Sequence, residues 1–198
     1  MDVELEDRAQ RIVDVAVELA EDGGFQAVRL RDVAQRADVA LGTLYARFKS
    51  KEDILVAALE QETRRLEVLL SEVPIAGETA HARVGTFFEI TSHALFARPN
   101  FARAVLRSVS SGVPEVATKV KSFQGRMTGL IIACIEDVAV SLDEATDPVP
   151  GEAATMGFLL QDIWFASLVG WMSGLKSEGE VIEYMRSATE LLVSDRSG

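Results

Sequence analysis

The sequence predicts an all-α protein in which a small N-terminal domain of three helices precedes a larger helical bundle. Apolar residues recur three and four residues apart along the 198-residue chain, as Ile12, Ala16 and Leu19 do, and long strand-like alternation is missing. Gly and Pro residues separate the apolar segments, which is typical of connections between helices. We assign residues 1–56 to the N-terminal domain and residues 57–198 to the bundle.

Composition narrows the class of protein. A hydrophobic fraction of 48% suffices for a packed core, and the single cysteine, Cys134, excludes an internal disulfide. No signal peptide precedes the first expected helix, so we expect a cytoplasmic protein. The most apolar stretch, residues 156–172, is shorter than the roughly 20 residues of a membrane span, and Gln161 and Asp162 interrupt it. We therefore expect no membrane span.

Charge is distributed unevenly along the chain. The formal net charge is −11. Between Arg29 and Lys51, six basic and two acidic residues give a local charge of +4, which leaves −15 for the rest of the chain. Bulk negative charge argues against a nucleic-acid partner only if it is spread evenly, and a local basic segment on an acidic body is compatible with one.

Local signals define the N-terminal helices. The first amphipathic helix should end at the "DGG" of residues 22–24, because glycine accepts the left-handed conformation of a helix end. Two short helices, "LRDVAQRA" and "LGTLYARF", flank "DVA", which is too short to be anything but a turn. A long helix over 52–72 follows, with Ser50 as its cap and Glu52 and Asp53 in its first turn.

Two short helices joined by a three-residue turn form a helix-turn-helix, although the same pattern also fits a plain helical hairpin. A small apolar core should hold the motif against the neighbouring helices. We expect this core to contain Ile12, Val33, Ala34, Val39, Leu44, Phe48 and Leu55.

The second short helix has an outward face that consists of Leu41, Gly42, Thr43, Tyr45, Ala46 and Arg47. Gly42 lacks a side chain, so the helix could lie close to a DNA backbone. The Thr43 and Tyr45 hydroxyls can donate to phosphates, and Lys51 begins the next helix, whose amides also favour phosphate. Leu41 could contact a base methyl group or lie at the rim, and Arg47 could read a base or be a solvated charge.

The segment "GGFQAVRLRDVAQRADVALGTLYARFKSKEDIL" resembles the DNA-binding domain of TetR-type transcriptional regulators, over roughly residues 8–58. The resemblance combines the Gly-Phe start, the "DVA" of the first short helix, "GTLY" and the "F-x-SKE" spacing. It implies a helical homodimer whose second motif helix enters the major groove of double-stranded DNA. It also implies that Thr43, Tyr45 and Lys51 contact phosphates.

Three positions depart from the family pattern. Val28 and Arg29 stand where the family usually caps the first short helix with Ser or Thr, and Arg29 could instead reach phosphate or the minor groove. Asp38 replaces the usual Gly of the turn, and Asp tolerates left-handed geometry better than most residues. Ala40 stands where the family often has Ser, so one cap and one phosphate contact are expected to be missing.

The rest of the chain reads as apolar helices over 79–97, 99–110, 113–141, 151–176 and 178–194. Pro99 and Pro114 are expected to open helices, because proline fits the first helical turn. The two histidines, His81 and His93, have no Cys or carboxylate partners at metal-ligand spacing, and phosphate-binding loops and nucleophile elbows are missing. We expect neither an enzyme nor a cofactor, and Cys134 should be a buried small hydrophobe.

Aromatic residues cluster in the expected bundle, which is typical of an apolar ligand pocket with a few polar groups. Any one of them could equally belong to an ordinary core. The candidate pocket residues are Phe87, Phe88, Thr91, Phe101, Phe123, Gln124, Met127 and Trp164, with His93 as a further polar candidate.

The segment "ATMGFLLQDIWFASLVGWMSG" is apolar nearly all round a helix, so it must be covered on more than one side. We expect it to form, with residues 181–193, a two-fold four-helix dimer interface, although it could instead be central within one chain. The candidate interface residues are Phe158, Phe165, Ala166, Gly170 and Ser173.

These features indicate a homodimeric repressor that a hydrophobic or amphipathic small molecule releases from its operator. "RADVALGTLYARFKSKEDILVAAL" and "IWFASLVGWMSG" also resemble the actinobacterial repressors of sterol catabolism, whose effectors are steroid-type acyl-CoA thioesters. Two alternatives stay open at this point. One is a DNA-binding protein without an effector, and the other is a small helical enzyme or a carrier of hydrophobic ligands.

Overall fold

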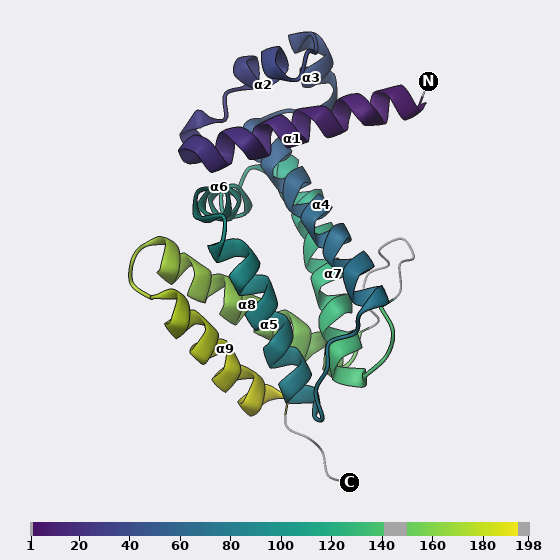
Figure 1. The fold of residues 1–198 in the computed structure, drawn as a ribbon, viewed down its shortest axis with the longest axis vertical. Coiled ribbons are helices and arrows are strands. Elements are labelled where there is room, and N and C mark those ends of the chain that lie inside the picture. The colour runs from purple at the N-terminus through teal and green to yellow at the C-terminus, as the bar shows by residue number, and fades with distance from the viewer. Residues whose placement is uncertain (1, 141–149, 194–198) are drawn as a thin grey trace. The chain divides into compact units, whose positions relative to one another are not determined.

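The structure, a computed structural model, describes residues 2–140 and 150–193, and the regular elements in those ranges are all helical (Figure 1). This confirms the all-α prediction. The elements are α1 (Asp2–Ala27), α2 (Leu30–Arg36), α3 (Leu41–Arg47), α4 (Lys51–Glu72), α5 (Ala80–Phe96), α6 (Pro99–Val109), the 3-10 turn η1 (Pro114–Val116), α7 (Ala117–Glu136), α8 (Glu152–Met172) and α9 (Glu178–Leu192).

Contacts divide the chain into two compact units. The N-terminal unit extends to Glu62 and also includes Arg98–Val120, whereas the C-terminal unit comprises Thr63–Ala97 and the residues after Val120. Both α4 and α7 therefore contribute residues to each unit. The boundary expected at residue 56 lies inside the continuous helix α4, and as a boundary of independent folding it stays a prediction.

Most helix ends lie within a few residues of their expected positions, and backbone geometry explains the exceptions. α1 contains a kink at Gly23 and Gly24, and Gly24 has a left-handed φ of 66°, as expected for the "DGG" signal. The helix expected over 113–141 ends earlier, at Glu136, because Asp137 takes a left-handed φ of 55°. Residue 141 lies outside the described residues. Arg83 then donates from Nε to the Cys134 carbonyl at 2.8 Å and from Nη2 to the Ile135 carbonyl at 3.2 Å.

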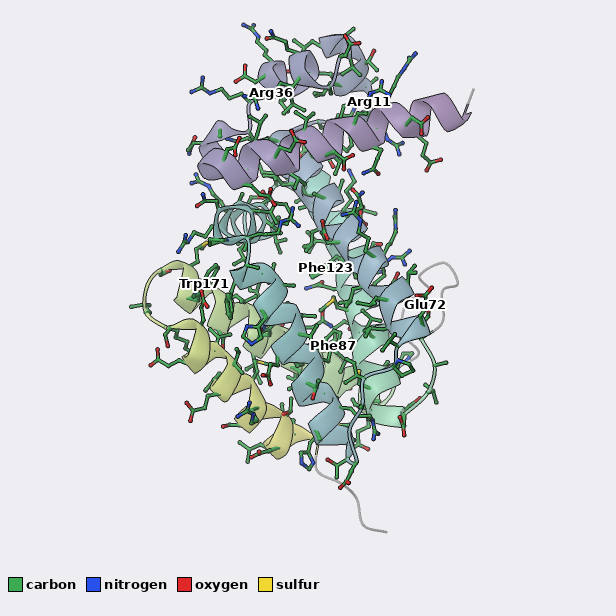
Figure 2. All side chains as sticks on the ribbon, in the orientation of Figure 1. Arg11, Arg36, Glu72, Phe87, Phe123 and Trp171 are labelled. Atoms are coloured by element: carbon green, nitrogen blue, oxygen red, sulfur yellow. The ribbon has the colours of Figure 1, made fainter. Side chains whose placement is uncertain are left out.

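The core of the N-terminal unit contains the expected residues of the helix-turn-helix. Ile12, Val33, Ala34, Leu44, Phe48 and Leu55 are all buried, and Val39 packs against them. The turn between α2 and α3 is sharp because Asp38 has a φ of 52° and the Val39 amide donates to the Ala34 carbonyl at 3.0 Å. Asp38 therefore takes the left-handed conformation that the sequence predicted. Figure 2 shows Arg11 on α1, and its Nε donates to the Ala37 carbonyl of this turn at 3.4 Å.

The two short helices begin without side-chain caps. Arg29 precedes α2 and Ala40 precedes α3, and neither side chain caps its helix. This agrees with the two expected departures from the family pattern. Ser50, by contrast, accepts from the Asp53 amide at 3.1 Å and so caps α4 as predicted.

A buried carboxylate joins three segments of the N-terminal unit. Asp53 is 3% exposed and accepts from the Lys49 amide at 2.9 Å. Its other oxygen forms an ion pair with Lys119 at the start of α7. Lys119 also lies 5.3 Å from the centroid of the Phe48 ring. One side chain therefore links the end of α3, the start of α4 and the start of α7.

Helix α6 completes the N-terminal unit, although it lies far from the motif in sequence. Phe101, Ala104 and Val105 of α6 belong to the same buried cluster as Ile12 and Leu44. Arg98 forms ion pairs with Glu21 of α1 and, at 3.2 Å, with Glu62 of α4. The sequence pattern did not indicate this placement.

The C-terminal unit is built around α5, α8 and α9, with residues from α4 and α7. Phe87, Phe88 and Trp164 lie at its centre, where the ring centroids of Phe87 and Phe88 are 5.3 Å apart and those of Phe88 and Trp164 are 5.6 Å apart. Such tilted and edge-on pairs contribute to stability beyond the area that they bury. A capping box of Ser177 and Glu180 begins α9.

Within the described ranges, α8 is the one helix long and apolar enough to cross a membrane, with a mean hydropathy of 1.3. The central helix of a bundle has the same length and composition. Its side chains Leu160, Trp164, Leu168 and Trp171 are buried within the unit, as expected for such a helix.

We predict that Lys119→Met lowers the free energy of unfolding by about 2 kcal/mol, because it leaves the buried Asp53 carboxylate without its cation. Urea unfolding followed by circular dichroism measures this change. Lys119→Arg retains the charge and should restore most of the stability. Equal unfolding midpoints for Lys119→Met and the wild type would show that the pair does not stabilise the fold.

Candidate functional site

Helix α3 presents most of its surface outward. Among its seven residues, Leu44 is fully buried, whereas Tyr45 is 47% exposed and Gly42, Ala46 and Arg47 are also exposed. Thr43 is half-buried. Leu41 packs partly against the core of the N-terminal unit, which agrees with the rim position considered for it. The side chains of Tyr45, Ala46 and Arg47 are therefore exposed to a partner.

Nothing in the folded chain requires a glycine at position 42. A Cβ atom built on Gly42 would meet no atom within 4 Å, and the residue has ordinary helical geometry. Replacing a glycine by alanine where the backbone geometry is ordinary gains roughly 0.4–1 kcal/mol, because alanine loses less conformational entropy on folding. The fold therefore does not explain this residue, whereas close approach of a partner would.

An open groove of about 410 Å³ runs between the N-terminal turns of α1 and helix α3. It is lined by Glu6, Arg8, Ala9, Ile12, Thr43, Ala46 and Arg47. Sequence reasoning did not select the start of α1 as part of the site. Its helical periodicity alone did not show that it would lie beside the outward face of α3.

Lys51 lies at the start of α4, where it is already bound within the chain. Its Nζ donates to the Phe25 carbonyl at 3.1 Å and lies 3.8 Å from the centroid of the Phe25 ring. Burial lowers the pKa of Lys51, and the nearby Arg107 and Arg29 lower it further, whereas Glu52 raises it. An ammonium has three donors, so this lysine can bind an anion as well as Phe25. Arg29 is exposed.

Five of the candidate pocket residues are buried in the C-terminal unit. They are Phe87, Phe88, Thr91, Met127 and Trp164. Phe123 is half-buried, Gln124 is exposed on α7, and His93 is exposed on α5. Figure 2 shows Phe87 on α5 and Phe123 on α7. Phe101 lies elsewhere, in the core of the N-terminal unit, so the structure does not group it with the other pocket candidates.

Several polar side chains of the C-terminal unit are buried next to these apolar ones. Trp164 Nε1 donates to Ser92 Oγ at 2.9 Å, and Gln161 Nε2 donates to Thr128 Oγ1 at 2.6 Å. The Thr91 hydroxyl donates to the Phe87 carbonyl at 2.9 Å. These groups satisfy one another.

An ion pair between α4 and α7 contains a buried polar atom that has no hydrogen-bond partner. Arg126 Nη1 lies 2.7 Å from Glu67 Oε2, and the two side chains are 15% and 10% exposed. Among the described side chains, Arg126 Nε is the buried polar atom left without a hydrogen-bond partner. An unmade buried hydrogen bond costs roughly 1–3 kcal/mol, so this N–H would gain from an acceptor that a ligand brings. The sequence analysis did not select Glu67 or Arg126, because partners 59 residues apart carry no spacing signal.

The outward side of α8 and α9 carries large apolar side chains. Phe158 is 43% exposed and Leu159 is 47% exposed on α8, while Tyr184 and Leu191 on α9 are 53% and 82% exposed. Of the other expected interface residues, Ala166 and Ser173 are exposed, and Phe165 and Gly170 are half-buried. The side chain of Lys176 lies 3.3 Å from the Cβ position of Gly170, so a residue of the same chain already occupies that space.

Catalytic and metal-binding constellations are not evident in the described residues. No group of three or more His, Cys, Asp or Glu side chains there could hold a metal ion. Cys134 is buried, and this burial raises the pKa of its thiol to about 11, so it stays protonated at neutral pH. His81 lies 3.3 Å from the Thr79 hydroxyl.

Comparisons with known proteins agree with this geometry. The family model "Bacterial regulatory proteins, tetR family" matches residues 12–58, which include α2, α3 and the start of α4. The HTH-type transcriptional repressor KstR of Rhodococcus jostii (strain RHA1) is 30% identical over 191 residues, which are 96% of this chain and 85% of that protein.

Solved structures share the whole fold. A TetR transcriptional regulator from Rhodococcus sp. RHA1 superposes with a TM-score of 0.81 at 26% identity, over 98% of this chain and 100% of that chain. The regulator FadR of Bacillus subtilis, crystallised in complex with stearoyl-CoA, has the same fold with a TM-score of 0.66 at 20% identity, over 93% and 97% of the two chains. The exposed face of α3, the family match across it and the similarity over nearly the whole chain lead to one conclusion: this chain belongs to the TetR family of transcriptional regulators.

Proposed function

We propose that this protein is a homodimeric repressor that binds operator DNA through α3 and leaves it when a bulky hydrophobic acyl-CoA thioester binds the C-terminal unit. The observation that carries the proposal is the outward face of α3, which combines an unneeded glycine with hydroxyl and guanidinium groups. These are the groups that contact phosphates and base edges in a DNA groove.

The DNA contacts follow from exposure. Tyr45 is a large aromatic residue that is 47% exposed, and its hydroxyl can donate to a phosphate oxygen, as can that of Thr43. Arg47 and Ala46 line the groove beside α3 and are our candidates for base contacts, with Gly42 permitting close approach. Leu41 contributes to the rim, since it packs partly on the core.

The dimer contacts follow from apolar exposure on α8 and α9. Several large apolar side chains exposed on two neighbouring helices are costly in water and are typical of a subunit interface. We propose that Phe158, Phe165, Ala166 and Ser173 pack against the same face of a second copy, and that Leu159, Tyr184 and Leu191 extend it. Two α3 helices would then enter successive major grooves of a palindromic operator.

The nature of the effector follows from the polarity of the C-terminal unit. Its aromatic and aliphatic side chains suit a large hydrophobic group, and the open Nε–H of Arg126 suits a neutral acceptor such as a carbonyl oxygen, since Glu67 already balances the charge. The resemblance to actinobacterial repressors of sterol catabolism and the similarity to the Rhodococcus jostii repressor support a steroid-type acyl-CoA. The stearoyl-CoA complex of FadR supports the thioester class.

Helices α4 and α7 are our candidates for transmitting effector binding. Each contributes residues to both units, and ion pairs join them twice, through Asp53 and Lys119 in the N-terminal unit and through Glu67 and Arg126 in the C-terminal unit. An effector shifts the equilibrium only if it binds the DNA-free conformation more tightly than the DNA-bound one.

Selection of bound sequences from a random DNA pool tests the proposal as a whole. The selection is repeated with a steroid-type acyl-CoA thioester, with stearoyl-CoA and with a short-chain thioester. We expect a palindromic sequence to be enriched, and the bulky thioester to abolish the enrichment. A pool without enrichment would refute DNA recognition, whereas enrichment that no thioester changes would refute the effector.

We predict that Gly42→Ala stabilises the free protein by about 0.5–1 kcal/mol. Alanine loses less conformational entropy on folding than glycine does, and its methyl group displaces no atom. The same change should weaken operator binding about tenfold, since the methyl group occupies the space of a DNA contact. Thermal unfolding and fluorescence anisotropy measure the two effects. Gly129→Ala on α7, where a Cβ also meets nothing within 4 Å, is the matched control and should leave DNA affinity unchanged.

We predict that Phe158→Glu converts the dimer to a monomer at micromolar concentration, because the carboxylate would be buried between two apolar faces. Sedimentation velocity measures the mass. Val68→Glu is the matched control, since Val68 is 48% exposed on α4 outside this face. A dimer of Phe158→Glu with unchanged mass would place the interface elsewhere.

We predict that the double variant Arg126→Met/Glu67→Leu needs at least tenfold more steroid-type acyl-CoA for release of operator DNA, while its DNA affinity without effector is unchanged. Both partners are replaced so that no buried charge is left alone. The exposed pair of Arg186 and Glu89, changed to glutamines, is the control and should respond like the wild type. Release of the double variant at the wild-type concentration would remove Arg126 from the effector site.

A further inference from the structure

Two basic side chains from different helices lie over the ring of Phe25 in the N-terminal unit. Lys51 of α4 lies 3.8 Å from the centroid of the Phe25 ring, and the guanidinium carbon of Arg107 on α6 lies 4.4 Å from the same centroid. The two cationic centres are therefore within about 8 Å of each other. Arg29, which precedes α2, is close enough to perturb Lys51.

Gathering like charges is unfavourable unless something balances them. Burial, Arg107 and Arg29 lower the pKa of Lys51, whereas Glu52 is the acid that raises it. Arg107 and Arg29 are both exposed, so solvent screens part of the repulsion. Phe25 offsets another part, because its ring attracts both cations and its carbonyl accepts from Lys51 at 3.1 Å.

The arrangement suits an oxyanion. Lys51 supplies a compact charge with unused donors, and the guanidinium groups supply planar pairs of N–H donors that match two phosphate oxygens. The cluster also adjoins the DNA-binding motif, since Arg29 immediately precedes α2 and Lys51 follows α3 by four residues. A DNA strand that passes α3 would bring a backbone phosphate to this place.

We propose that Lys51, Arg107 and Arg29 form one site for an operator backbone phosphate, with Phe25 as its platform and Arg107 as a contact supplied by α6. This inference rests on the proposed function, because it requires α3 to bind DNA. Lys51 and Arg29 were already candidates for DNA contact, and the new element is a phosphate ligand from a helix outside the helix-turn-helix. The Arg107 side chain sits there because α6 packs in the core of the N-terminal unit.

The site gives effector binding a direct route to DNA affinity. α6 follows α5 of the C-terminal unit after only Ala97 and Arg98. With so short a connection, a displacement of the end of α5 can reach α6, which carries Arg107. Loss of one phosphate contact per subunit would weaken binding to all sequences alike and would leave base recognition unchanged.

The test is the salt dependence of operator binding, measured by anisotropy from about 50 to 300 mM salt with the selected operator. Each phosphate contact adds about one to the slope of log K against log salt for every subunit. We expect Arg107→Gln to reduce the slope by about one for every subunit and to weaken operator and unrelated DNA by the same factor. Arg107→Met keeps the aliphatic packing on Phe25 and should give the same two results as Arg107→Gln. It is the control for misfolding caused by lost packing.

Arg64→Gln is the matched control. Arg64 is exposed on α4, thirteen residues beyond Lys51 and thus about 20 Å along the helix, and its removal should leave the slope unchanged. Wild-type slopes for the folded Arg107 variants would overturn the α6 contact while leaving DNA recognition by α3 intact. A wild-type protein that binds no DNA would overturn both proposals.

Discussion

The geometry of the N-terminal unit depends on one buried carboxylate. Asp53 accepts from the amide of Lys49, pairs with Lys119, and has its own amide capped by Ser50. These contacts define where α3 ends, where α4 begins and where α7 starts. Because a buried carboxylate is costly without its partners, separation of any one of the three segments is unfavourable. The orientation of the exposed face of α3 is therefore tied to two long helices that continue into the C-terminal unit.

The same chemistry recurs in the C-terminal unit with a different outcome. Glu67 and Arg126 again join α4 to α7, but the Nε of Arg126 is left open, whereas the oxygens of Asp53 are used. An ion pair whose polar atoms all have hydrogen-bond partners holds two helices firmly together. An ion pair with one polar atom left open, in an apolar unit, is a place where a ligand can add a hydrogen bond. The Asp53–Lys119 pair thus suits a DNA-binding unit of fixed geometry, and the Glu67–Arg126 pair suits the unit that we propose binds the effector.

Charge distribution matches this division. The acidic body opposes contact with DNA, and the basic side chains around α2, α3 and Phe25 concentrate attraction on one small region. Arg107 extends that region to α6, which no motif in the sequence indicated. Association with DNA would then be favourable in one orientation, with little affinity elsewhere on the surface.

The sequence alone was sufficient for the all-α class, the helix-turn-helix with its core, the Ser50 cap and the left-handed Asp38, because each follows from periodicity or from neighbours within a few residues. Only the tertiary structure placed Phe101 in the N-terminal core, Lys176 over Gly170, Arg107 on Phe25 and Glu67 against Arg126. Most of these contacts join residues that are tens of positions apart. Their formation depends on how helices pack, and helical spacing shows which face of a helix is apolar without showing which helix will cover it.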